Sequence, residues 1–239
     1  MAAPAAQSPE VQRMAEALRL QKSEEGRWKG YHFKPKREDV MIVSPAKCGT
    51  TWVCQIVQSL RSRGNMDFDE INLVGWGHPL PADGLWDGGY GEPDQPQRWQ
   101  PRVFKTHWWE PDCPKGAGKR IYIVRDPMEA GPCFFYFMRG WAFEEGDISL
   151  DQFILEFFMW RGDAQSPLQN ASQWSNMASW YPWRTDPDVL WLHYEDLHED
   201  RGAAVKLIAD FLGLEDPERQ AIAVEQSSIQ FHEGAPNQV

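Results

Sequence analysis

The stretch VMIVSPAKCGTTW (residues 40–52) decides the fold of this 239-residue chain. Its four apolar residues, Val40 to Val43, predict a buried strand. A short turn with one lysine and one glycine follows, and two threonines then begin a pattern typical of a helix. A strand, a glycine-containing turn and a helix often bind phosphate, because the N–H groups and the macrodipole at the helix start attract an anion. The stretch therefore predicts an α/β protein with an anion site at this turn.

Three further strands are expected at the short apolar runs 102–107 (RVFKTH), 120–124 (RIYIV) and 188–194 (DVLWLHY). Strands that alternate with helices predict a parallel sheet, whose ligands bind at the carboxyl ends of the strands. A basic connector is expected at 26–39. Helices are expected from Ser8-Pro9-Glu10, from Thr50 to near Gly64, over 149–160 with a Ser149/Gln152 capping box, over 172–182, from Tyr194 to Leu212 with Gly213 as C-cap, and from Asp216.

The composition limits the classes of function. The length predicts one domain, 1–239, in which 1–30 is an N-terminal helix and connector. The net charge of −11 argues against a general nucleic-acid binder, which would carry a basic face. It does not exclude a small anionic ligand, because a few cations can reverse the field locally.

The four cysteines and the N-terminal residues indicate the compartment. No CxxC pair occurs, so a structural zinc site is not expected, and reduced thiols are favoured over disulfides. The opening MAAPAAQSPE has no apolar signal region, and no uncharged stretch is long enough to span a membrane. We therefore expect a cytoplasmic protein without a membrane partner.

The turn after the first strand is not a Walker A motif, because its lysine precedes its glycine. The glycine permits close backbone approach, the threonines offer hydroxyls, and the lysine offers a mobile charge. Each residue alone has a structural reading, as a turn glycine, a capping threonine or a core tryptophan. After a strand, the combination favours phosphate binding by Lys47, Cys48, Gly49, Thr50 and Thr51, with Trp52 able to stack on a base.

Four segments resemble those of the cytosolic-type sulfotransferases, over about Phe33 to Phe231. KCGTTW resembles the phosphosulfate-binding loop, and RVFKTH resembles the catalytic Lys-Thr-His segment. IYIVRDP resembles the strand and turn at the 3′-phosphate, and VLWLHYEDL resembles a later strand. The resemblance implies a P-loop-like three-layer fold with a central parallel sheet flanked by helices. It also implies transfer of a sulfuryl group from 3′-phosphoadenosine 5′-phosphosulfate to the hydroxyl or amine of a small molecule.

The implied chemistry explains three catalytic candidates. The acceptor must lose a proton as it attacks sulfur, and His107 can take it, because histidine changes charge near neutral pH. Lys47 and Lys105 can stabilise the negative charge of the transferring and leaving groups. The structural alternatives are a strand-end histidine for His107 and a solvated surface lysine for Lys105. No metal is needed in principle, and no Asp/Glu cluster suggests one.

The resemblance also implies the residues that hold the cofactor. Arg125 would bind the 3′-phosphate, since a planar guanidinium suits such an anion. Cys133 stands where the family places a serine hydroxyl for the same phosphate. The adenine-pocket positions are Trp52, Tyr194, Ser227 and Ile229, although a sheet-end tyrosine is also a common structural feature.

The sequence departs from the family pattern in three respects. Cys133 is a weaker hydrogen-bond donor than serine. Gly131-Pro132 lies inside an expected helix, where proline costs about 3 kcal/mol and can cause a kink. The family normally continues into a basic, glycine-containing segment that completes the 3′-phosphate site, and none is found up to Val239.

The acceptor side is expected in the segments 75–101 and 141–185. Acidic residues in these loops favour a neutral or cationic acceptor: Asp83, Asp87, Glu144 and Glu145. Tryptophans could form the wall of an acceptor cavity, or could simply be packing residues. They are Trp76, Trp86, Trp99, Trp141, Trp174, Trp180 and Trp183, together with Trp108 and Trp109 after the candidate base.

Two other functions remain open at this point. A nucleotide kinase or NTPase with a degenerate loop would need Mg²⁺ and an acidic ligand after a strand, for which Asp126 is the obvious candidate. A non-catalytic nucleotide-binding module could keep the fold alone. The Lys-Thr-His segment at 105–107 argues against both.

Overall fold

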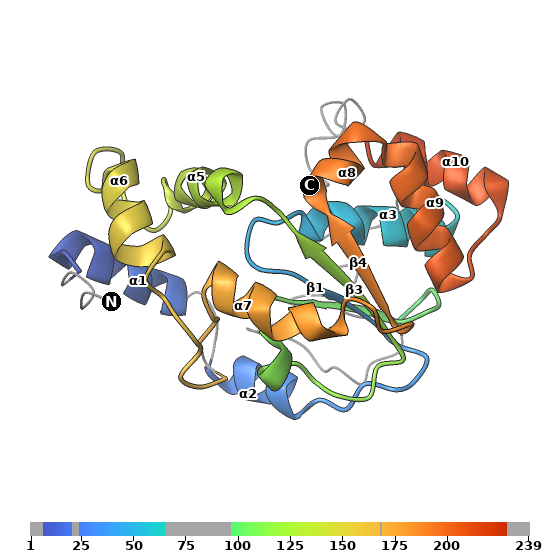
Figure 1. The fold of residues 1–239 in the computed structure, drawn as a ribbon, viewed down its shortest axis with the longest axis horizontal. Coiled ribbons are helices and arrows are strands. Elements are labelled where there is room, and N and C mark those ends of the chain that lie inside the picture. The colour runs from blue at the N-terminus through green and yellow to red at the C-terminus, as the bar shows by residue number, and fades with distance from the viewer. Residues whose placement is uncertain (1–6, 21–23, 66–96, 168, 229–239) are drawn as a thin grey trace.

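The computed structural model describes residues 7–20, 24–65, 97–167 and 169–228. Four parallel strands form one sheet in the order β2-β1-β3-β4. The central strand β1 (Val40–Val43) lies between β2 (Val103–Thr106) and β3 (Lys119–Val124), and β4 (Val189–His193) pairs with β3. Because all the strands are parallel, the turns that follow them meet at one edge of the sheet (Figure 1).

Helices cover both faces of the sheet, which confirms the predicted α/β three-layer arrangement (Figure 1). On one face lie α3 (Thr50–Ser62), α8 (Tyr194–Glu199), α9 (Arg201–Leu212) and α10 (Pro217–Gln226). The expected apolar stripe of α3 is fully buried against the strands and α9: Val53, Ile56, Val57 and Leu60. The helical spacing of the apolar residues after the first turn therefore predicted which face of α3 is buried.

The opposite face is covered by α2 (Glu24–His32), α7 (Gln173–Trp180), η1 (Glu110–Asp112) and η3 (Tyr181–Trp183). Its core is aromatic, and the rings of Tyr122 and Trp180 stack with centroids 5.5 Å apart. The other large members of this cluster are Phe33, Phe104 and Met41.

A third group of helices lies beside the carboxyl edge of the sheet, at the left of Figure 1. It contains α1 (Pro9–Leu20), α5 (Pro127–Met138), α6 (Leu150–Phe153) and a π-helical turn, η2 (Ile154–Phe158). Their shared core is rich in phenylalanine: Phe134, Phe135, Phe153, Phe157 and Phe158. The capping box of Ser149 and Gln152 is confirmed, and α5 continues through Pro132 as one helix.

Two sequence-based expectations about elements are wrong. Residues 26–32 of the expected connector belong to the helix α2 (Glu24–His32), which carries two glycines and no apolar stripe. Tertiary contacts hold it instead, among them the hydrogen bond from Arg27 to the carbonyl of Pro167 at 3.1 Å. The helix expected from Tyr194 to Leu212 is divided at Asp200, whose carboxylate caps α9 by accepting from the N–H of Ala203. Lys105 lies inside β2, within the strand expected at 102–107.

A buried ion pair joins the starts of the two strands β1 and β2. Arg102 donates to both carboxylate oxygens of Asp39, at 2.8 and 2.6 Å, and Asp39 has no exposed surface. The N–H of Lys36 donates to the same carboxylate at 2.7 Å. This pair fixes the end of the sheet that lies opposite the ligand-binding edge.

All four cysteines, Cys48, Cys54, Cys113 and Cys133, are free. Within the described ranges, no helix has the length and apolar character needed to cross a membrane. Most of the expected loop at 75–101, including Trp76, Trp86, Asp83 and Asp87, lies outside the described residues.

Candidate active site

The turn after β1 has the backbone of an anion-binding loop. Lys47 and Gly49 both have positive φ angles, 65° and 99°. A side chain at position 49 would place its Cβ 2.8 Å from the ring of Tyr194, so only glycine fits here without movement. α3 begins at Thr50, and Gly49 provides no side-chain cap. Backbone N–H groups of the first turn can therefore bind a ligand anion.

The side chains of the turn have different surroundings. The hydroxyls of Thr50 and Ser44 form a buried hydrogen bond with each other. Cys48 is fully buried, and burial raises the pKa of its thiol to about 12, so the thiol keeps its proton at neutral pH. Cys48 can therefore contact a ligand only through its backbone. Thr51, at the start of the helix, is partly exposed.

A second group of predicted residues meets on the far side of this turn. The ring of Tyr194 lies between Trp52, with centroids 5.5 Å apart, and the guanidinium of Arg125, 4.1 Å from its centroid. The indole N–H of Trp52 donates to the carbonyl of Ser227 at 2.9 Å. Four candidates from four distant segments are thus adjacent, and Ile229 lies outside the described residues.

Arg125 follows β3 and precedes α5. Its guanidinium pairs with Glu129, one turn along α5, at 3.1 Å, and its side chain is 17% exposed. Cys133, a further turn along this partly buried face, is close enough to interact electrostatically with Arg125 and Cys48. An anion could reach Arg125 by competing with the exposed carboxylate of Glu129.

His107 lies one residue past β2, at the same edge of the sheet as the turn. Its Nδ1 is 3.0 Å from the carbonyl oxygen of Ser44. A carbonyl only accepts, so Nδ1 donates, and the lone pair of the neutral ring is on Nε2. This is the tautomer that a general base at Nε2 requires.

Asn176 on α7 is a positioning residue that the sequence reasoning missed. Its amide donates to the carbonyl of His107 at 2.9 Å, and its own oxygen accepts from the hydroxyl of Tyr122 at 2.8 Å. Both Asn176 and Tyr122 are buried. The available sequence signal was an asparagine at a helical position that is buried. Its partner, His107, is 69 residues away in the sequence.

The two candidate lysines differ in exposure. Lys105 is only 4% exposed, so its alternative reading as a solvated surface lysine is wrong. It shares the face of β2 that Val103 turns toward α3, and it interacts electrostatically with Cys54 of that helix. The ammonium of Lys47 lies 4.2 Å from the ring centroid of Phe137 on α5.

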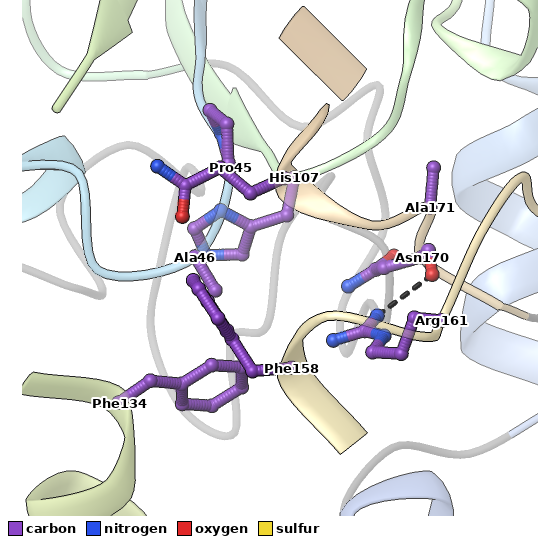
Figure 2. A pocket seen from close by; sticks show the side chains of 9 residues that line it. Pro45, Ala46, His107, Phe134, Phe158, Arg161, Asn170 and Ala171 are labelled. Carbon is purple, nitrogen blue, oxygen red and sulfur yellow. Dashed lines mark hydrogen bonds between the residues drawn. The ribbon is translucent and has the colours of Figure 1, made fainter. Parts of the chain in front are cut away.

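A cavity opens beside His107, with about 350 Å³ of empty space when its open mouth is included. Figure 2 shows the imidazole of His107 above the rings of Phe134 and Phe158, with Arg161 and Asn170 at another side. The turn after β1 contributes to the same wall. The full lining is Pro45, Ala46, His107, Phe134, Phe158, Arg161, Asn170, Ala171 and Gln173.

The aromatic wall consists of phenylalanines, and none of the described tryptophans lines the cavity. Trp108 and Trp180 are buried core residues instead, at 1% exposure. The sequence reasoning missed Phe134 and Phe158 because their apolar spacing is typical of any buried helix.

The described acidic residues of the acceptor segments also lie away from the cavity. Glu144 and Glu145 are exposed, and Glu145 pairs with Arg139 at 2.9 Å. Arg161 and His107 are the ionisable residues of the lining. In the described part of the chain, no group of three or more His, Cys, Asp or Glu is arranged to hold a metal ion.

Comparisons with known proteins identify relatives of this chain. Human sulfotransferase 1E1 is 28% identical over 186 residues, covering 74% of this chain and 60% of that protein. Human sulfotransferase 2A1 is 27% identical over 204 residues, covering 83% of this chain and 67% of that protein. The chain thus spans about 60% of the length of the first of these relatives.

Solved structures share the fold at lower identity. Mouse sulfotransferase SULT7A1 complexed with PAP has a TM-score of 0.65 at 22% identity, covering 92% of this chain and 76% of that one. Retinol dehydratase in a complex with retinol and PAP has a TM-score of 0.66 at 17% identity, covering 95% of this chain and 80% of that one. The family model of the sulfotransferase domain matches residues 37–237, which is most of the sequence. The chain therefore belongs to the sulfotransferase family.

Proposed function

We propose that this protein transfers a sulfuryl group from 3′-phosphoadenosine 5′-phosphosulfate to a hydroxyl or amine of a small molecule. One observation carries the proposal: the turn after β1 faces two sites at once. Gly49 is packed against Tyr194 in the aromatic group, while Pro45 and Ala46 line the cavity of His107. A donor on one side of the turn and an acceptor on the other would meet at the start of α3.

The residues present fit the proposed cofactor. The uncapped first turn of α3 suits the phosphosulfate, and Gly49 has no side chain to stand between its backbone and the anion. Arg125 suits the 3′-phosphate, and the aromatic residues Trp52 and Tyr194 offer faces to a purine. When bound, the cofactor supplies the sulfuryl group and the bisphosphate leaving group. Cys133, Ser227 and Ile229 complete the proposed set by family position.

The protein's own groups would then act on the acceptor. Nε2 of His107 takes the proton of the attacking group, while Ser44 and Asn176 hold the ring and its backbone in place. Lys47 and Lys105 offset the negative charge that develops during transfer. The exposed contact of the Lys47 ammonium with an aromatic ring is weak enough to be exchanged for an anion.

The family organisation supports one sulfotransferase-like domain, 1–239, with 1–30 as its N-terminal part. The lining residues from 158 to 173 support 141–185 as an acceptor-side segment, and 75–101 remains proposed as the second. Of the neutral or cationic acceptors expected from the sequence, we favour a neutral one, because the lining contains Arg161 and no carboxylate. The free cysteines support a cytoplasmic location.

The kinase alternative is disfavoured by the role of Asp126. Its carboxylate caps α5, accepting from the N–H of Met128 at 2.8 Å. Its backbone N–H donates to Glu195 at 2.9 Å. The acidic residue that would have to bind Mg²⁺ is therefore engaged in holding the turn.

Thermal unfolding with two nucleotides tests the proposed function. We expect adenosine 3′,5′-bisphosphate (PAP), without Mg²⁺, to raise the melting temperature more than ATP with Mg²⁺ at equal concentration. The ligand with the lower Kd stabilises the native state more, by mass action. A larger shift with ATP and Mg²⁺ would overturn the proposal and favour a kinase.

Arg125→Ala tests the 3′-phosphate site. The variant should bind PAP more weakly by about 1.5–3 kcal/mol, because a charge-assisted contact is lost. Adenosine 5′-phosphate, which lacks the 3′-phosphate, should change little. Calorimetric titration measures both. Arg139→Ala, at the end of the same helix and paired with exposed Glu145, is the matched control. Equal losses for both nucleotides would show that Arg125 does not read the 3′-phosphate.

A further inference from the structure

One side chain that lines the cavity has a buried polar atom with no hydrogen-bond partner among the described residues. Gln173 is only 5% exposed, and it lines the cavity beside His107. Its Nε2 donates to the carbonyl of Arg125 at 2.8 Å. Because that carbonyl can only accept, the hydrogen bond fixes the orientation of the amide. Within the described residues, its Oε1 is buried and has no hydrogen-bond partner.

A second amide oxygen in the lining is in the same condition. Oδ1 of Asn170 is buried and has no hydrogen-bond partner among the described residues. The backbone carbonyl of Asn170 accepts a hydrogen bond from Arg161 at 2.7 Å, drawn as a dashed line in Figure 2. This bond joins two residues of the cavity wall. Neither amide oxygen belongs to the proposed transfer chemistry.

Buried acceptors of this kind are costly when no donor faces them, so native proteins pair them with protein, water or ligand. The space open to the centre of a water-sized group in this cavity is about 20 Å³, which is enough for one water molecule. A ligand that displaces such a water must supply the donor itself, or it loses affinity.

We infer that Gln173, with Asn170, selects acceptors that carry a second hydrogen-bond donor besides the group that reacts. The reacting hydroxyl faces Nε2 of His107, and a second hydroxyl donates to Oε1 of Gln173 or Oδ1 of Asn170. The acceptor class is therefore a small neutral diol or dihydroxyaromatic compound. Arg161 in the same wall disfavours an ammonium group as the second donor. This inference rests on the proposed function and makes its acceptor more specific.

The test compares catechol, resorcinol and hydroquinone with the corresponding 2-, 3- and 4-methoxyphenols. Each pair differs by replacing one O–H donor with a methyl ether. In the wild-type protein, the preferred dihydroxybenzene should exceed its ether in kcat/KM by about tenfold or more, because the ether leaves a buried acceptor unpaired. The ratio of their Kd values, measured calorimetrically on the protein saturated with PAP, should differ in the same sense.

Gln173→Met has a similar size and lacks the oxygen. It should bring both ratios to within about threefold of unity, since any disturbance of Arg125 affects both members of a pair alike. Asn170→Ala, at a partly exposed loop position, is a second variant in case the first does not fold, and it should lower the ratio. Gln169→Met changes an exposed glutamine of the same segment outside the lining, and it should leave the ratio unchanged.

A wild-type protein with no preference for any dihydroxybenzene would overturn the inference, as would unchanged ratios in both lining variants. If no probe is sulfated, the Kd ratios decide the inference, while the comparison of PAP with ATP and Mg²⁺ decides the proposed function. Absence of binding by all three dihydroxybenzenes to the PAP complex would then count against the inference.

Discussion

Replacing His107 with alanine should lower kcat by about 10²–10⁴-fold, which is the usual contribution of a general base. KM and the affinity for PAP should change little, because the lost interaction belongs to the transition state. Steady-state kinetics with a phenolic acceptor and calorimetric titration with PAP measure these quantities separately. In the wild-type protein, activity should rise with pH as the imidazole loses its proton, and the variant should lack this rise.

The contact between Nδ1 and Ser44 requires a control for folding, because the substitution removes it. An unchanged circular dichroism spectrum and intact PAP binding would show that the fold is kept. His198→Ala, at an exposed position of α8, is the matched control and should retain the wild-type rate and pH profile. If His107→Ala turned over at nearly the wild-type rate, His107 would be a structural residue, and the base would have to lie elsewhere.

Asp39→Ala should lower the free energy of unfolding by about 3–5 kcal/mol, because it leaves Arg102 buried without its carboxylate. The side chain of Arg102 is 7% exposed and the carboxylate of Asp39 is fully buried, so water cannot replace the lost partner easily. For a domain of this size, the melting temperature should fall by about 6–20 °C. Urea unfolding monitored by tryptophan fluorescence measures the change directly.

Lys206→Ala is the control for this ion pair. Lys206 pairs with Asp210 at 2.6 Å, but its side chain is 65% exposed. Removal of such a surface pair should cost less than about 1 kcal/mol. If Asp39→Ala and Lys206→Ala changed stability equally, the buried pair would not hold the start of the sheet.

The sequence was sufficient to predict the elements whose patterns are local. The apolar run at 40–43 predicted a strand, and the apolar stripe of α3 predicted a buried helix. Both signals are local, because a buried strand or helix face needs apolar residues at the spacing of that element. The capping box of Ser149 and Gln152 and the C-cap at Gly213 were predictable for the same reason, since each depends on residues within one turn.

The elements that were missed have two different causes. α2 has no apolar stripe, and its buried Arg27 donates to a carbonyl 140 residues away. α8 is divided from α9 at Asp200, whose side chain caps α9. Capping competes with continuation of the helix, and the sequence alone does not show which of the two has the lower free energy. Contacts outside the segment therefore stabilise α2, whereas competition between two local arrangements sets the boundary of α8 and α9.

The sequence was enough to predict the four strands, the helices that have local signals and the chemical identity of the candidate groups, because these are local properties of the chain. Only the tertiary structure decided that Trp52, Tyr194 and Arg125 pack together and that His107 is held by Ser44 and Asn176. It also decided that the cavity wall contains phenylalanine and amide side chains, where the sequence left open a wall of tryptophans. Side chains from distant segments become neighbours only through the register of the sheet and the packing of helices on it, and no local pattern encodes those distances.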